Sequence, residues 1–221
     1  MDFFDDSEMT FGPYPPGQGF RVDGSEPHDA AGESVKMIDF YKLDLQPGKA
    51  PRLWLVEAKK SSPNADSPNY LKSIEALEKK RSRLRSQEHA KAVSTLIDLV
   101  HAHGSILSPM ISSDYDIYIS DICAKMNNGL SLFFSARAGR WPSHQNAWPE
   151  DFMRVDPGDL QVRILLIVKT AEARWLSGLQ DALRKAMRPV IGTWALGADS
   201  IVVLNEDGAR QKGFVGDRIV A

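Results

Sequence analysis

Two acidic residues and one lysine occur in two neighbouring apolar segments of the chain, and their types suit metal-assisted hydrolysis. Asp39 lies within the first segment, and Glu57 and Lys59 close the second. Carboxylate and carbonyl oxygens are ligands for a hard divalent cation, and an amine can orient a water or help to deprotonate it. The residue types therefore predict phosphodiester hydrolysis, with Asp39, Glu57 and the Ala58 carbonyl holding Mg²⁺ (or Mn²⁺) and Lys59 beside the attacking water.

The elements that must position these side chains are two predicted strands, residues 35–45 and 52–60, joined across a turn rich in Pro and Gly. Side chains alternate between the two faces of an extended strand. Glu57 and Lys59 therefore share one face of the second strand. When the strands pair as a hairpin, Asp39 can meet them from the first strand, and the two carboxylates and the amine converge.

The second half of the chain supplies the elements of a layered fold. A capping-box pattern at Ser113 predicts a helix that ends near Gly139. A continuous apolar run, residues 160–169, predicts a strand buried on both faces at the centre of a sheet. The helix has apolar residues in steps of three and four, which is typical of a helix facing a core: Ile119, Ile122, Met126, Leu130 and Phe133.

The elements that follow complete an α/β order. Residues 175–187 are amphipathic and predict a helix that should stop before Pro189. Residues 200–204 predict a last buried strand. A hairpin, a helix, a strand, a helix and a strand in this order predict an α/β fold with a mixed central β-sheet flanked by helices.

The chain divides by composition into an N-terminal segment and one domain. Residues 1–34 are rich in Gly, Pro, Asp and Ser, so we interpret them as an extended segment over the domain, with a short edge strand near residues 19–23. Residues 35–221 have the length of one α/β domain. Within that domain, residues from about 68 to 103 predict a helical insertion with a basic middle.

Composition and charge limit the class of protein. No apolar run approaches the roughly 20 residues that span a bilayer, and the acidic first residues are unlike a secretory signal, so we expect a cytoplasmic protein with no membrane partner. The single cysteine, Cys123, excludes an internal disulfide and a Cys-rich zinc site. A net charge of -2 gives no global attraction to a polyanion, so nucleic acid would require a locally basic surface or a partner.

The two charged segments also carry a family pattern. A strand with an acid, a turn, and an apolar strand ending in Glu-x-Lys, followed by a helix and a further strand, resembles the PD-(D/E)XK, or restriction-endonuclease-like, nuclease superfamily. The matching residues are Ile38 and Asp39 for the first half-motif and Glu57, Ala58 and Lys59 for the second. The chain departs from the pattern in having Ile38 where the family often has proline.

The resemblance covers residues 35–60 in motif and about 113–205 in the order of elements. It implies a restriction-endonuclease-like core and metal-dependent cleavage of nucleic acid, most often DNA. It also implies that Asp39 and Glu57 are metal ligands and that Lys59 is a catalytic base or phosphate contact. No helix with an acid is evident before residue 35, which leaves a third ligand unassigned.

The resemblance implies further roles and leaves alternatives open. It suggests restriction, repair or antiviral defence, with a homo-oligomer or a partner protein subunit. Lys125, Asn127 and Asn128 lie where the superfamily places auxiliary polar residues. The basic middle of the insertion can neutralise phosphates but equally fits a solvated helix face; it comprises Lys79, Lys80, Arg81, Arg83 and Arg85. A second hypothesis is a catalytically inactive nuclease-fold protein that acts as a structural or interaction subunit.

Overall fold

The computed structural model describes residues 1–32, 34–62, 91–92, 94–95, 114–140, 146–197 and 199–216. The chain divides into two compact units, residues 1–62 with 119–221, and residues 63–118. In the second unit the structure describes helical residues at 91–92 and 94–95 and the first residues of helix α4 (Asp114–Arg137). The predicted insertion at about 68–103 therefore lies almost wholly outside the described residues.

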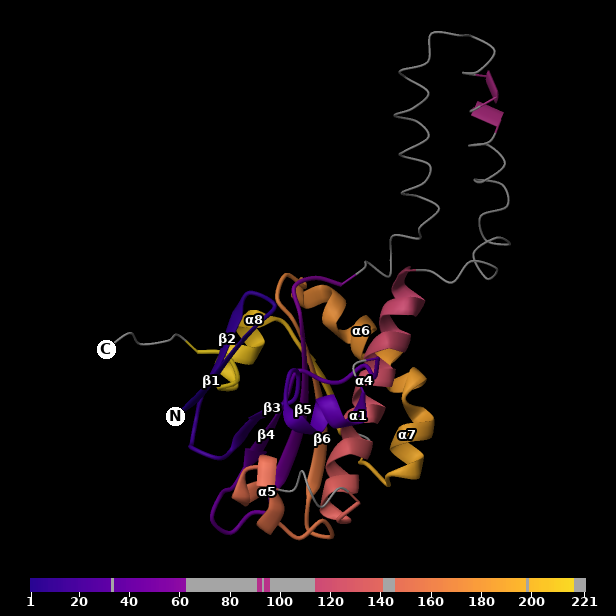
Figure 1. Cartoon of the computed structure of the whole chain (residues 1–221). Helices are drawn as coiled ribbons and strands as arrows, with labels where there is room; N and C mark the ends of the chain where they lie inside the picture. The colour runs from indigo at the N-terminus through magenta and orange to yellow at the C-terminus, as the bar shows by residue number, and fades with distance from the viewer. Residues whose placement is uncertain are drawn as a thin grey trace. The chain divides into compact units, whose positions relative to one another are not determined.

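Within the described residues of the first unit, five strands form a mixed sheet in the order β3-β4-β5-β6-β7 (Figure 1). Adjacent strands run antiparallel to each other from β3 to β5 and parallel from β5 to β7. The strands are Gly19–Arg21, Phe40–Asp44, Arg52–Lys59, Gln161–Val168 and Ile201–Leu204. The predicted mixed sheet flanked by helices is confirmed at this level of description.

Two details of the predicted strands are wrong. The central strand is β5, and β6 lies beside it, because a continuous apolar run reports burial on both faces and not the position in the sheet. Strand β4 begins at Phe40 and not at residue 35. The preceding residues, 36–38, run outside the ladder, although Ile38 is fully buried.

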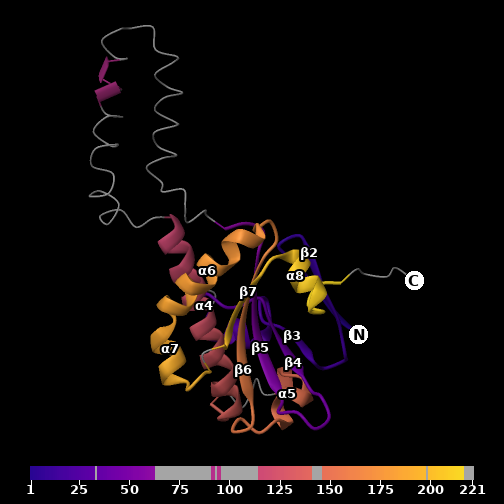
Figure 2. The same cartoon turned by 180° about the vertical axis from the view of Figure 1, so that it is seen from behind.

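One face of the sheet is covered by α4, α6 (Ala173–Ala186) and α7 (Arg188–Thr193), which lie on the same side in both views (Figures 1 and 2). The predicted apolar stripe of α4 is buried along its whole length. The helix ends in a Schellman arrangement, in which Gly139 has φ 67° and donates to the Ala136 carbonyl. Helix α6 stops as predicted, and Pro189 then falls in the first turn of α7.

The other face is covered by a hairpin of β1 (Asp2–Asp6) and β2 (Met9–Tyr14) together with α8 (Glu206–Gln211) (Figure 2). Its core joins Phe11 and Tyr14 of the hairpin to Trp54 and Val56 of β5 and Phe214 after α8. Residues 1–34 also contain the edge strand β3, as predicted, and helix α1 (Glu26–Ala31).

The sequence did not indicate the β1–β2 hairpin. A two-residue hairpin loop with positive φ at both positions is usually formed by Asn-Gly or Gly-Gly. Here Ser7 and Glu8 take those positions, with φ of 48° and 62°. In the part of the chain that the structure describes, no helix is long and apolar enough to cross a membrane.

Candidate active site

Asp39 and Glu57 meet where β4 begins and β5 ends, at the carboxyl edge of the parallel strands. Phe40 pairs with Val56; Asp39 comes immediately before Phe40, and Glu57 comes immediately after Val56. The Asp39 N–H donates to the Val56 carbonyl at 3.2 Å, and Asp39 Oδ2 accepts from the Ala58 N–H at 2.6 Å. The side chain of Asp39 thus takes the place that a longer β4 backbone would occupy. Open α/β sheets usually bind ligands at this edge.

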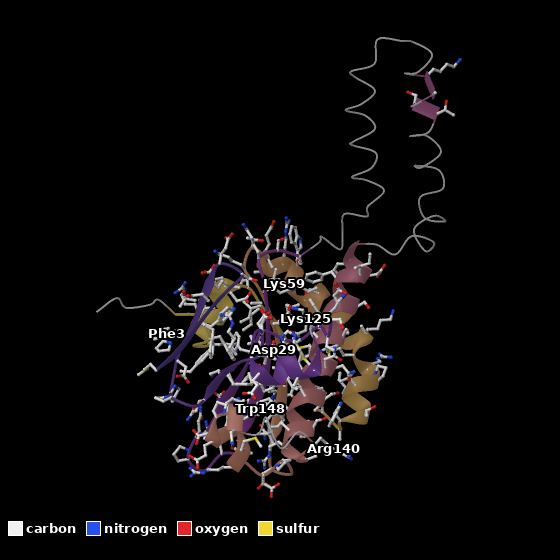
Figure 3. All side chains as sticks on the ribbon, viewed as in Figure 1. Phe3, Asp29, Lys59, Lys125, Arg140 and Trp148 are labelled. Carbon is white, nitrogen blue, oxygen red and sulfur yellow. The ribbon has the colours of Figure 1, made fainter. Side chains whose placement is uncertain are left out.

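Glu57 is fully buried and is held by two lysines. Its Oε1 lies 2.6 Å from Lys59 Nζ and 2.7 Å from Lys125 Nζ. Lys59 reaches it along β5, whereas Lys125 comes from α4, and both labels fall at the same end of the sheet in Figure 3. Lys125 Nζ also lies 3.9 Å from Asp39 Oδ1. One ammonium group therefore faces both carboxylates.

Lys125 joins the site because α4 packs against Tyr41 of β4 and against Ile38 just before it. Lys125 lies three residues after Ile122 and four before Gly129, on the helix face that meets the sheet. The buried hydroxyl of Tyr41 donates to the Gly129 carbonyl at 2.6 Å, which fixes the helix over the strand. Asn128, which was predicted as an auxiliary residue, instead donates to the Lys36 carbonyl. The sequence pointed to Lys125 only through the resemblance to the superfamily, as one of three auxiliary polar residues.

Burial and the neighbouring charges shift the pKa values of the groups in the cluster. Burial raises the pKa of Asp39 to about 7, the Glu57 charge adds to this rise, and the hydrogen bond from Ala58 opposes it. Burial also raises the pKa of Glu57, against the attraction of Lys125 and Lys59. Burial would lower the pKa of Lys125, but the Glu57 carboxylate and its hydrogen bond reverse this effect and raise it. The Asp39 carboxyl can therefore lose its proton near neutral pH, as the binding of a cation would require.

The turn of the β1–β2 hairpin adds groups that the sequence did not indicate. Ser7 Oγ lies 2.9 Å from Asp6 Oδ1 and 3.1 Å from the Ala58 carbonyl oxygen. The Asp6 charge contributes to the raised pKa of Asp39. The hairpin thus reaches the strand end that carries the predicted carbonyl ligand.

The donor set fits a hard divalent cation. Magnesium is usually bound through one or two carboxylates and keeps several waters. Glu57 Oε2 is buried and has no hydrogen-bond partner in the described part of the chain, so its lone pairs are available to a ligand. No group of three or more His, Cys, Asp or Glu residues that could hold a metal occurs among the described residues. Asp39 and Glu57, with the Ala58 carbonyl and waters, are then the ligands that would hold the ion.

The structure does not test the predicted contacts with nucleic acid. The basic stretch of Lys79, Lys80, Arg81, Arg83 and Arg85 lies outside the described residues, so its contact with nucleic acid stays a prediction. Trp148 is buried with its ring 4.5 Å from that of Phe20 and 5.4 Å from that of Tyr41. It anchors the connection after α4, away from the label of Lys59 in Figure 3.

Comparisons with protein-family models, with curated proteins and with solved structures found no match. The geometry and chemistry of the carboxylate cluster therefore carry the functional proposal.

Proposed function

We propose that this chain is a metal-dependent nuclease with a restriction-endonuclease-like core. The observation that supports the proposal is the cluster at the end of β5. There the Lys125 ammonium group faces both Asp39 and Glu57, and the Lys59 ammonium group contacts the same oxygen of Glu57 as Lys125 does. Buried carboxyl groups with raised pKa values at the carboxyl edge of a sheet are typical of a functional site. The order of an antiparallel pair, helix α4 and parallel strands supports the same proposal.

Each residue of the cluster has a role in this proposal. Asp39 and Glu57, together with the Ala58 carbonyl, would hold Mg²⁺ or Mn²⁺, and Asp39 would have to give up its proton to do so. A bound ion of this kind neutralises charge on a phosphate and lowers the pKa of a water. Lys59, whose side chain is 32% exposed, can reach the substrate and orient the attacking water or contact the phosphate. Lys125 is a positioning residue that holds the Glu57 carboxylate.

DNA is the proposed substrate. Because the net charge is -2, binding of a polyanion must come from local lysines, from the basic stretch of the insertion, or from a partner subunit or second copy of the chain. We place the activity in the cytoplasm, in restriction, repair or antiviral defence, as the resemblance to the superfamily implies.

The proposal is tested by cleavage and by metal binding together. Purified protein is incubated with plasmid, linear duplex, single-stranded DNA and RNA in Mg²⁺, Mn²⁺ or EDTA. We expect metal-dependent cleavage that Glu57→Gln and Lys59→Ala each reduce by on the order of 100-fold or more. The matched control is Lys49→Ala, an exposed lysine in the β4–β5 turn that contacts Gln46. Calorimetric titration with Mn²⁺ should show binding that Glu57→Gln abolishes and Lys59→Ala retains. Cleavage that neither substitution changes would exclude this site.

One observation favours the second hypothesis, a non-catalytic nuclease-fold subunit. Glu57 Oε1 is already neutralised by two ammonium groups, which is also how a buried structural ion cluster is arranged. This hypothesis predicts no Mn²⁺ binding to the wild-type chain and no cleavage in any metal. The titration separates the two hypotheses even if cleavage requires a partner.

A further inference from the structure

Two lysines that the proposed chemistry does not use stand side by side next to the site. Lys60 follows the last residue of β5, and Lys169 follows the last residue of the parallel strand β6. The backbone fixes their separation, because the Lys169 N–H donates to the Lys59 carbonyl at 2.8 Å and the Thr170 N–H donates to the Lys60 carbonyl at 3.1 Å. The hydroxyl of Thr170 donates to the same Lys60 carbonyl at 3.0 Å. The ends of β5 and β6 thus hold the Lys60 and Lys169 side chains next to each other through backbone hydrogen bonds.

The acid that meets these lysines comes from the turn of the β1–β2 hairpin. Glu8 Oε1 lies 2.5 Å from Lys60 Nζ, and Glu8 Oε2 lies 3.6 Å from Lys169 Nζ. Lys169 Nζ also donates to the Glu8 carbonyl at 2.8 Å. Ser7, the neighbour of Glu8 in this turn, contacts the Ala58 carbonyl of the site. One hairpin turn therefore touches both the lysine pair and the predicted ligand strand.

The position of the pair follows from strand geometry. Successive side chains of a strand point to opposite faces, so Lys59 faces α4 and Glu57, whereas Lys60 faces the hairpin. The end of the sheet therefore offers ammonium groups on both faces, from Lys59 and Lys125 on one and from Lys60 and Lys169 on the other. A nucleic-acid strand that crosses this end can place one phosphate at the carboxylate cluster and a neighbouring phosphate at the second pair.

We propose that Lys60 and Lys169 form a subsite for a nucleic-acid phosphate next to the scissile one, and that the Glu8 carboxylate occupies this subsite until a phosphate displaces it. The proposal rests on the proposed nuclease function for the identity of the polyanion. A carboxylate and a phosphate offer the same anionic oxygens to an ammonium group. Glu8 and Lys60 are both more than half exposed, and ion pairs of that kind are weak, so a polyanion can displace Glu8.

The test is binding of fluorescein-labelled 20-nucleotide duplex and single-stranded DNA, followed by fluorescence anisotropy in EDTA so that no cleavage occurs. We expect Glu8→Gln to tighten binding about 3- to 10-fold by removing the competing charge. The double variant Lys60→Gln/Lys169→Gln should weaken binding about 10-fold or more and reduce the slope of log K against log salt by about 1 to 2. In that double background Glu8→Gln should have no further effect.

Matched controls separate local from global charge effects. Glu150→Gln removes an exposed acid that pairs with Arg154 in α5 (Glu150–Arg154), and Lys49→Gln removes an exposed lysine of the β4–β5 turn. Both should leave affinity within about twofold, because charges beyond a Debye length are screened. Thermal unfolding followed by tryptophan fluorescence checks that every variant is folded.

The outcomes test the phosphate subsite separately from the nuclease activity. Binding by wild type that neither Glu8→Gln nor the double lysine variant alters would overturn the subsite, whatever the cleavage assay shows. The absence of binding by both wild type and Glu8→Gln would also overturn it. Binding that changes as expected in a chain that neither takes up Mn²⁺ nor cleaves would keep the subsite and reject the nuclease.

Discussion

Asp39→Asn should abolish metal binding and yet make the protein more stable at alkaline pH. Asp39 is 9% exposed, and its pKa is raised to about 7, first by burial and then by the Glu57 charge. An asparagine oxygen can still accept the hydrogen bond from the Ala58 N–H, so the substitution removes the charge and keeps the shape.

The sign and size follow from proton linkage. The native state keeps the Asp39 proton up to about pH 7, whereas the unfolded chain releases it near 3.8. The native state thus binds more protons across this window, so the free energy of unfolding falls as pH rises through it. A difference of about 3 pKa units corresponds to at most about 4 kcal/mol, of which about 2–3 kcal/mol develops between pH 5 and pH 8. Asp39→Asn removes this pH-dependent loss of stability.

The measurement is urea unfolding in EDTA at pH 5, 6.5 and 8, followed by the fluorescence of the five tryptophans. The stability of Asp39→Asn relative to wild type should increase by about 2–3 kcal/mol from pH 5 to pH 8. Addition of Mg²⁺ at pH 8 should stabilise wild type and leave the variant unchanged. The control, Asp181→Asn, removes a 78% exposed carboxylate near Arg184 and should show no such pH dependence. A difference between Asp39→Asn and wild type that does not vary with pH would refute the assignment of a buried, protonated Asp39.

Three further predictions concern the cluster and the helix that supports it. Because Asp39 must lose its proton to hold a cation, the apparent affinity for Mn²⁺ should fall as pH drops below about 7, and calorimetric titrations that are flat from pH 5.5 to 8 would contradict this. Lys125→Met leaves the fully buried Glu57 carboxylate with Lys59 as its one ammonium partner. We therefore expect the free energy of unfolding, measured in urea at pH 8, to fall by about 1–3 kcal/mol, and kcat to be lower. Unchanged values of both would rule out a positioning role. Gly129→Ala would place a Cβ 3.1 Å from Ile38 Cδ1 and should destabilise the protein by about 1–3 kcal/mol. Gly178→Ala in α6 has no atom within 4 Å of the new Cβ and should stabilise the protein by about 0.5–1 kcal/mol. Equal shifts of the melting temperature for the two variants would show that α4 does not pack on the site as described.

Local patterns in the chain were sufficient to predict the β4–β5 pair, the buried stripe of α4 and the strand β6. These patterns depend on the alternation of side chains along a strand and the 3.6-residue period of a helix, which the order of residues alone sets. The convergence of Asp39, Glu57 and Lys59 was predictable for the same reason, since two short strands joined by a short turn usually pair with each other. The end of α4 at Gly139 follows equally from local chemistry.

Contacts between segments far apart in the chain had no such local signal. Lys125 reaches Glu57 across 68 residues, and Ser7 reaches Ala58 across 51. The β1–β2 hairpin escaped prediction because Ser7 and Glu8 supply a turn that usually requires Asn or Gly. The position of β5 at the centre of the sheet likewise depends on which strands pair.

The sequence by itself determined which residues are candidates for chemistry: one carboxylate just before β4, and a second carboxylate and a lysine at the end of β5. Only the tertiary structure decided their state. In the folded chain Glu57 is removed from water, burial and the Glu57 charge raise the pKa of Asp39 to about 7, and α4 brings Lys125 close to both acids. Charge and spacing are properties of the chain, whereas desolvation and the meeting of distant charges arise only when the layers pack together.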